Sequence, residues 1–168
     1  MNAAVWLGGG FFFLFGTTPA ISSSAMQSLL GDRYFSYFSA GIENIALARF
    51  YHFEIVCALI AFLHLLAEWL YLGRPSRRFS GSLLVALFLV AFIGSNVFQP
   101  RLRALHTTTY SRSAQPAERQ AAARSYRVWS VVAAILNYAV MGGLVVYLWR
   151  VANPSDTPRF ISSVKFRG

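Results

Sequence analysis

The segment "IALARFYHFEIVCALIAFLHLLAEWLYL", Ile45–Leu72, is an apolar run of 28 residues with few charges in it. Strands are usually three to ten residues long, whereas a helix needs about 20 apolar residues to cross the roughly 30 Å hydrocarbon core of a bilayer. The run therefore predicts a membrane-spanning helix. Because it is longer than one crossing requires, we expect the helix to tilt or to project its first turns, Ile45–His52, into the interface.

Three further apolar blocks surround this run, at Val5–Ile21, Ser82–Phe98 and Val128–Val151. Even a block of 17 residues reaches about 26 Å as a helix, which is close to the thickness of the hydrocarbon core. The sequence thus predicts an all-α protein, an integral membrane four-helix bundle in which residues 1–151 form one domain. We expect a flexible basic tail over residues 152–168.

Composition supports the same class of protein. Hydrophobic residues make up 56% of the chain and charged residues only 12%, and the mean hydropathy is +0.48. That leaves too little polar surface for a water-soluble protein of this size. The net charge of +9 comes from Lys and Arg spread over the loops at span ends, so we expect no nucleic-acid partner. The expected partner is the lipid bilayer, in a multi-pass protein of the cell membrane, either as a homo-oligomer or as a subunit of a larger complex.

The first block, within "LGGGFFFLFGTTPAI" (Leu7–Ile21), fits either a cleaved signal peptide or a first membrane helix. Signal peptides carry a positive amino-terminal region, and "MNAAVW" has no charged side chain, so we favour the membrane helix. Small residues at Gly8–Gly10 and Gly16 permit close helix contact in lipid. Pro19 removes a backbone hydrogen bond at membrane depth, where neighbouring groups have to compensate.

The connecting segments carry turn signals and basic residues. Ser22–Asn44 contains a turn signal at Gly31-Asp32 and an aromatic "RYFSYF" (Arg33–Phe38) that fits a position along the interface. Gly73–Gly81 reads as a tight basic turn. Within the third link, Pro116–Arg127 predicts a helix leading into the fourth span, because proline suits a first helical turn and alanine favours the helix behind it.

Polar residues inside the second span are the candidate functional residues, because ionisable groups in membranes are costly and usually face the bundle interior. At about 100° per residue, Glu54, Cys57, His64 and Glu68 fall on one stripe of the helix, with His64 and Glu68 as an i,i+4 pair. This stripe is either a path for a cation or proton, a ligand site, or a structural feature. The structural alternative pairs the carboxylates with arginines or with amides on neighbouring helices: Asn96, Gln99 and Asn137.

Two histidines at span ends raise the alternative of a haem or metal site. His52 and His106 fall near the same membrane face in an up-and-down bundle, and histidines on two helices can ligate one iron or copper ion. No haem-attachment, nucleotide, phosphate-loop or hydrolase motif is present in the sequence, and Cys57 has no second cysteine to pair with. We therefore predict no cofactor and name no catalytic residue.

The order of three short motifs resembles the family of transmembrane protein 205, a group of small four-span membrane proteins of poorly defined function. The motifs are "FFFLFGTTPAI" (Phe11–Ile21), "NVFQPRLRAL" (Asn96–Leu105) and "LN" (Leu136-Asn137). The resemblance implies a multi-pass membrane location and assigns no catalytic residue. The positions that match the family's motifs are Pro19, Asn96, Pro100 and Asn137. Ser130 stands where the resemblance leads us to expect a histidine.

These residues support one leading interpretation and two alternatives. The leading one is a non-catalytic membrane protein whose interior polar residues pack the bundle and handle a cation or a small amphiphile. In it, Asn96 and Asn137 bridge the third and fourth helices, and Pro100 ends or kinks the third span. One alternative is haem or metal binding through His52 and His106. The other is a membrane enzyme similar to the anthrone-oxygenase-like proteins, whose glycine-aromatic first helix and Asn-x-x-x-Pro third helix this chain shares.

Overall fold

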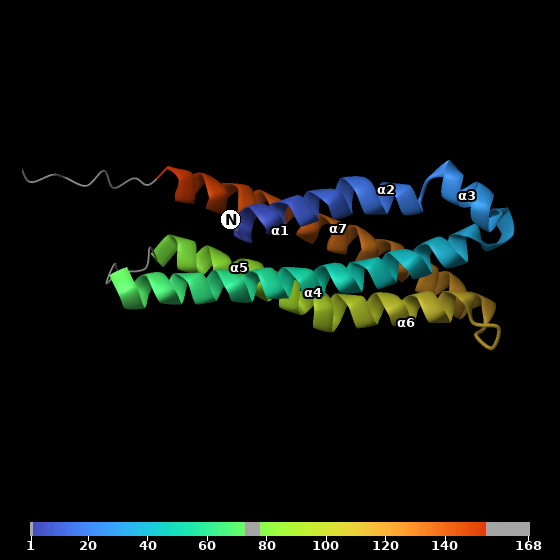
Figure 1. Ribbon diagram of the computed structural model, residues 1–168. Coiled ribbons are helices and arrows are strands. Elements are labelled where there is room, and N and C mark those ends of the chain that lie inside the picture. The colour runs from blue at the N-terminus through green and yellow to red at the C-terminus, as the bar shows by residue number, and fades with distance from the viewer. Residues whose placement is uncertain (1, 73–77, 154–168) are drawn as a thin grey trace, which may run out of the picture.

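Four long helical rods make up the computed structural model, which describes residues 2–72 and 78–153 (Figure 1). The first rod consists of α1 (Asn2–Phe11), the π-helical turn η1 (Phe12–Thr17) and α2 (Thr18–Ile21). The second rod is α4 (Asp32–Leu72), reached through the short helix α3 (Ser24–Leu30). The third rod consists of α5 (Arg78–Ile93), the π-helical turn η2 (Gly94–Phe98) and α6 (Gln99–Tyr110), and the fourth is α7 (Pro116–Ala152). The predicted all-α four-helix bundle is confirmed.

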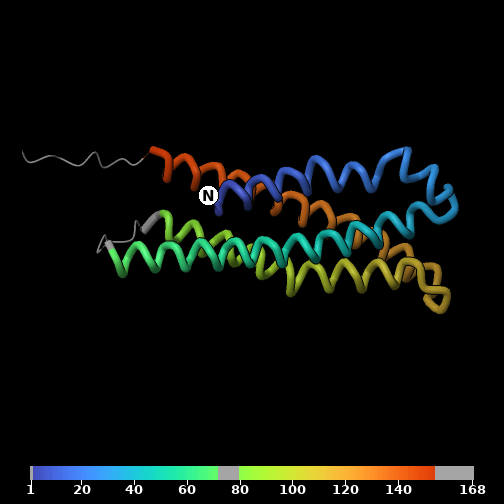
Figure 2. Tube along the Cα trace, in the orientation of Figure 1, coloured from blue at the N-terminus to red at the C-terminus, as the bar shows by residue number. Residues whose placement is uncertain are grey.

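Each rod is long and apolar enough to cross a membrane. The rods run up and down in turn, so α3 and the link between α6 and α7 lie at the same end of the molecule (Figure 2). In cross-section the four rods form a ring. The first rod packs against α4 and α7, and the third rod also packs against α4 and α7. A residue that points inward from any rod therefore meets the other three near the bundle axis.

The connecting segments are far more helical than the sequence indicated. The expected link Ser22–Asn44 contains α3 and the first 13 residues of α4, and the turn predicted at Gly31 is confirmed by its φ of +73°. At 1.5 Å per residue α4 is about 60 Å long and α7 about 55 Å. Both exceed the roughly 30 Å hydrocarbon core, so we expect α4, α6 and α7 to extend beyond the lipid at the α3 end.

The structure confirms one of the other predictions about the connecting segments and contradicts another. The helix predicted at Pro116–Arg127 is confirmed as the start of α7, where Gln115 and Glu118 form a capping box. The segment "RYFSYF" is part of α4 and not a separate interfacial segment. Part of the basic turn predicted at Gly73–Gly81 belongs to α5, and residues 73–77 lie outside the described residues. The predicted tail lies outside them from residue 154 onward.

Both prolines of the family-like motifs sit two residues after a π-helical turn. Pro19 follows η1, and Pro100 follows η2. A proline inside a helix lacks a donor, and its ring clashes with the carbonyl four residues earlier, which a wider turn relieves. Of the two alternatives predicted for Pro100, ending the third span is wrong, because α6 continues to Tyr110.

The two π-helical turns meet α4 at the same level. From η1, the Phe13 ring stacks on Phe50 with centroids 4.3 Å apart. From η2, Gly94 packs directly against the ring of Tyr51, the next residue of α4. The parallel first and third rods are thus both interrupted at one depth, on either side of α4. Interrupted helices in corresponding positions are a feature that points to binding sites in membrane proteins.

Candidate functional site

The predicted polar stripe of α4 is only half buried. Glu54 and Cys57 are buried, whereas the side chains of His64 and Glu68 are 75% and 53% exposed and lie 3.4 Å apart. The reason lies in the length of the first rod. Asn2, the first described residue of α1, donates a hydrogen bond of 2.6 Å to the carbonyl of Cys57, so within the described residues α1 covers α4 only as far as this level. The prediction of one interior stripe is therefore wrong for His64 and Glu68.

The predicted amide bridge between the third and fourth helices is also not formed. Asn96 is exposed, and its amide nitrogen donates to the carbonyl of Phe92 in its own rod at 2.9 Å. Asn137 is buried and points into the bundle from α7, with its Oδ1 atom unpartnered. Of the two asparagines, only Asn137 contributes to the interior.

Four buried polar side chains meet near the bundle axis, and we refer to them as the interior cluster: Trp6, Tyr51, Glu54 and Asn137. They come from α1, α4 and α7. The indole of Trp6 adjoins the carboxyl of Glu54, and the hydroxyl of Tyr51 adjoins both Glu54 and Asn137. Trp6 Nε1, the Tyr51 hydroxyl, Glu54 Oε2 and Asn137 Oδ1 are all shielded from solvent and make no hydrogen bond. Such groups are rare in folded proteins and often mark functional positions.

A small cavity of about 60 Å³ extends from this cluster toward the α3 end of the molecule. Asn137 lines it together with residues from η1, α2, α4, α6 and α7, among them Thr18, Asn44 and Ala134. Asn44 is itself buried and donates a hydrogen bond of 3.3 Å to the Tyr126 hydroxyl. The cavity has room for water, because a site needs roughly 10–15 Å³ of this kind of space to hold one molecule.

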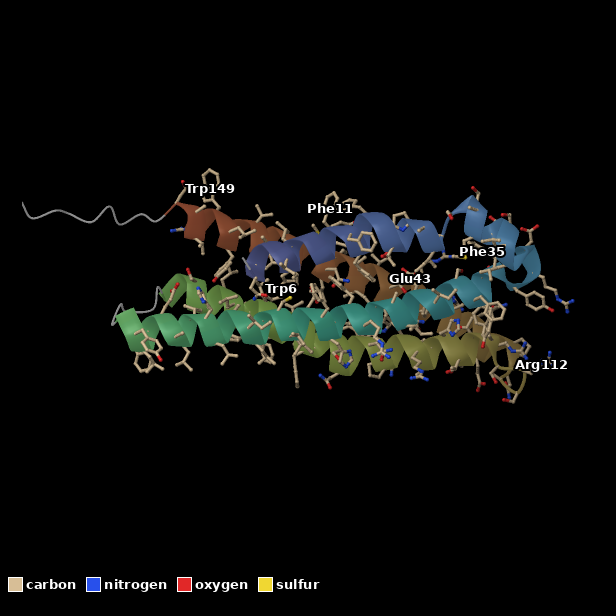
Figure 3. All side chains as sticks on the ribbon, viewed as in Figure 1. Trp6, Phe11, Phe35, Glu43, Arg112 and Trp149 are labelled. Atoms are coloured by element: carbon tan, nitrogen blue, oxygen red, sulfur yellow. The ribbon has the colours of Figure 1, made fainter. Side chains whose placement is uncertain are left out.

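A larger pocket of about 330 Å³ lies next to this cavity, between α4, α6 and α7. We refer to it as the end pocket. Its polar and aromatic lining residues include Glu43, His106, Tyr110, Tyr126, Arg127 and Ser130. Glu43, Tyr126 and Ser130 line both spaces, so the end pocket and the small cavity are neighbours. Figure 3 shows the labelled Glu43 nearer to the α3 end of the bundle than the labelled Trp6.

The end pocket combines an acid with aromatic rings. Glu43 is half-buried, and within the described ranges it forms neither an ion pair nor a side-chain hydrogen bond. The His106 ring stacks on Tyr37 with centroids 5.2 Å apart, and Tyr110 and Tyr126 lie within 5.1 Å and 6.1 Å of it. Arg127, the one arginine of the lining, is exposed. A half-buried carboxylate beside electron-rich rings favours a cation.

His52 and His106 are not brought together. His106 packs against α4 at Tyr37 and Gly41, whereas His52 lies eleven residues further along that helix than Gly41, about 16 Å away. The His52 ring is exposed and bonds to the carbonyl of Ala48 on its own helix. In the part of the chain that the structure describes, no three His, Cys, Asp or Glu side chains are grouped as metal ligands. The geometry does not favour the haem or metal alternative.

Several residues of these sites escaped the sequence analysis. Glu43 and Asn44 precede the apolar run and looked like part of a loop, although with Tyr51 and Glu54 they continue one buried face of α4 at helical spacing. That spacing was the available signal. Trp6 sits in a uniformly apolar block, where periodicity cannot show which residue points inward.

Comparison with known proteins adds no relative: no family, no curated protein and no solved structure matches this chain. The resemblance to the family of transmembrane protein 205 therefore stays a prediction.

Proposed function

We propose that the chain is a non-catalytic, multi-pass membrane protein that binds a small organic cation or cationic amphiphile in the end pocket. The observation that carries this proposal is the half-buried Glu43 carboxyl, which has no ion-pair partner among the described residues and lines a pocket that also contains His106, Tyr110 and Tyr126. A carboxylate supplies the charge, and the rings supply cation–π attraction of about 0.5–2 kcal/mol each.

The size and position of the end pocket fit such a ligand. Its volume of about 330 Å³ lies at the small end of the range for small-molecule sites, which is roughly 300–1,000 Å³. Glu43 stands two residues before the long apolar run, so the pocket is expected near the boundary between lipid and water. An amphiphile there places its charged group beside Glu43 and its apolar part toward the lipid.

Equilibrium binding of benzyltrimethylammonium to the full-length protein in lipid nanodiscs tests the proposal. Benzenesulfonate serves as the anionic probe of similar size. We expect the cation to bind, and Glu43→Gln to weaken binding at least tenfold, since loss of a charge-assisted contact costs about 1.5–3 kcal/mol. The matched control is Glu68→Gln, which removes an exposed carboxylate of the same helix and is expected to leave binding unchanged.

Two results would contradict the proposal. One is equal affinity of the Glu43→Gln variant and the unchanged protein for the cation. The other is binding of benzenesulfonate in preference to the cation, because Arg127 and not Glu43 would then define the ligand.

A further inference from the structure

Glu54 is an ionisable group enclosed in the interior of the bundle. Its side chain is 1% exposed, at the level where all four rods meet, and its Oε2 atom has no hydrogen-bond partner. The groups that face it are the Trp6 indole from α1, the Tyr51 hydroxyl and the Cys57 thiol from α4, and, through Tyr51, the Asn137 amide from α7. Across the described ranges no Lys, Arg or His side chain pairs with this carboxyl.

A carboxylate without a counter-charge is very costly in such surroundings, so buried acids are either paired or neutralised. No paired cation is available here, and uptake of a proton is the remaining way to remove the charge. The relative stability of the protonated and the ionised acid then depends on the hydrogen bonds that each form can make with the neighbouring amide and hydroxyl groups.

Counting donors among the four unpartnered atoms favours the protonated form. Trp6 Nε1 is only a donor, Asn137 Oδ1 is only an acceptor, and the Tyr51 hydroxyl has a single hydrogen to donate. If Glu54 is ionised, that hydrogen can serve Glu54 or Asn137 but not both. If Glu54 is protonated, its O–H donates to the Tyr51 oxygen while the Tyr51 O–H donates to Asn137. One added proton thus resolves the conflict between the two acceptors.

The route to this proton runs from one end of the bundle. Asn137 lines the small cavity, which has room for water and adjoins the end pocket through Glu43, Tyr126 and Ser130. On the other side of Glu54 the interior is filled by a cluster of small and apolar residues: Cys57, Ala58, Ala61, Leu84, Leu87, Val140 and Leu144. This packing separates the carboxyl from the far end of the bundle.

We propose that Glu54 is an intramembrane proton-binding site that exchanges its proton with water at the α3 end of the bundle, through the cavity that Asn137 lines. The site is separate from the organic-cation site at Glu43 and does not depend on it. If proton binding at Glu54 is disproved, the proposal of cation binding at Glu43 is unaffected, and the converse also holds.

Infrared difference spectroscopy of the full-length protein in nanodiscs at neutral pH tests the protonation. We expect a carbonyl band of a protonated carboxylic acid that shifts in D₂O, persists in Glu68→Gln and disappears in Glu54→Gln. Absence of the band from the unchanged protein, or its persistence in a folded Glu54→Gln variant, would overturn the proposal.

A second measurement needs no variant of Glu54. Dicyclohexylcarbodiimide adds to protonated carboxyls in apolar surroundings, so mass spectrometry of the unchanged protein is expected to find the adduct on Glu54 and not on Glu68. An adduct on Glu68 alone would overturn the proposal.

The route is tested by filling the cavity. Ala134 lines it, and Ala139 of the same helix is exposed on the outside of the bundle. We expect Ala134→Leu to slow the D₂O shift of the Glu54 band at least tenfold relative to Ala139→Leu. Equal exchange rates in the two variants would overturn the proposed route.

Discussion

Replacing Gly94 by alanine is expected to destabilise the bundle, because the added Cβ atom would overlap the ring of Tyr51. It would lie 2.6 Å from Tyr51 Cζ and 2.7 Å from Cδ1, well inside ordinary van der Waals contact, and Tyr51 is 1% exposed and so has no room to move. Overpacking of this kind costs about 1–3 kcal/mol, while alanine regains about 1 kcal/mol over glycine in a helix. Because the Tyr51 ring is fully enclosed, we take the upper figure of about 3 kcal/mol for the overpacking. Subtracting the gain of about 1 kcal/mol from alanine leaves an expected loss of about 2 kcal/mol in the free energy of unfolding.

The matched control is Gly142→Ala, because an added Cβ there meets nothing within 4 Å. Thermal unfolding in mild detergent measures both variants. A loss of about 2 kcal/mol corresponds to a fall of roughly 4–8 °C in Tm for a chain of this size, whereas Gly142→Ala is expected to leave Tm unchanged or to raise it. In a Tyr51→Ala background the cost of Gly94→Ala is expected to vanish, as a double-mutant cycle would show. Equal Tm values for Gly94→Ala and Gly142→Ala would refute the packing of η2 against Tyr51.

Three further substitutions test other parts of the structure. Asn96→Leu is expected to change stability by less than about 0.5 kcal/mol, because Asn96 is exposed and bonds only to its own rod; a loss above 1 kcal/mol in thermal unfolding would mean that Asn96 bridges to another helix. Glu68→Gln is expected to cost no more than about 0.5 kcal/mol, since its contact with His64 is exposed, and a larger drop in Tm would argue for a buried pair. Gln115→Ala removes half of the capping box and is expected to cost about 0.5–1 kcal/mol locally; hydrogen exchange should quicken at the amides of residues 117–119, and unchanged exchange there would contradict the role of the cap.

The fold class followed from the sequence because the length of an apolar run is a direct physical signal. Predominantly apolar runs of about 17 residues or more fit a bilayer crossing, so the apolar runs alone locate the four spans. They do not give the full lengths of the helices. The first 13 residues of α4 and all of α6 are amphipathic or polar, and they are helical in a structure where α6 packs against both α4 and α7. Tertiary packing of this kind leaves little trace in local propensity.

The candidate site was predictable only in part, and for a comparable reason. Glu54 and Asn137 stood out as polar residues inside apolar runs, and both are buried near the bundle axis. His64 stood out equally, yet it is exposed, because within the described residues α1 covers α4 only as far as Cys57. Helical spacing shows on which face of its helix a residue lies. Whether that face is buried depends on how far the neighbouring rod extends along it.

Cysteine accessibility shows whether a cation can enter the end pocket between α4, α6 and α7. Cys57 is the single cysteine of the chain, so Cys57→Ala provides a background for one introduced cysteine at a time. Ser130→Cys lines the end pocket, while Val132→Cys, two residues further along α7, lies outside it, where the native side chain is 37% exposed. In nanodiscs, we predict that a membrane-impermeant cationic methanethiosulfonate reagent labels Ser130→Cys rapidly and Val132→Cys at most slowly. Labelling of Val132→Cys at an equal or greater rate would contradict the proposed site.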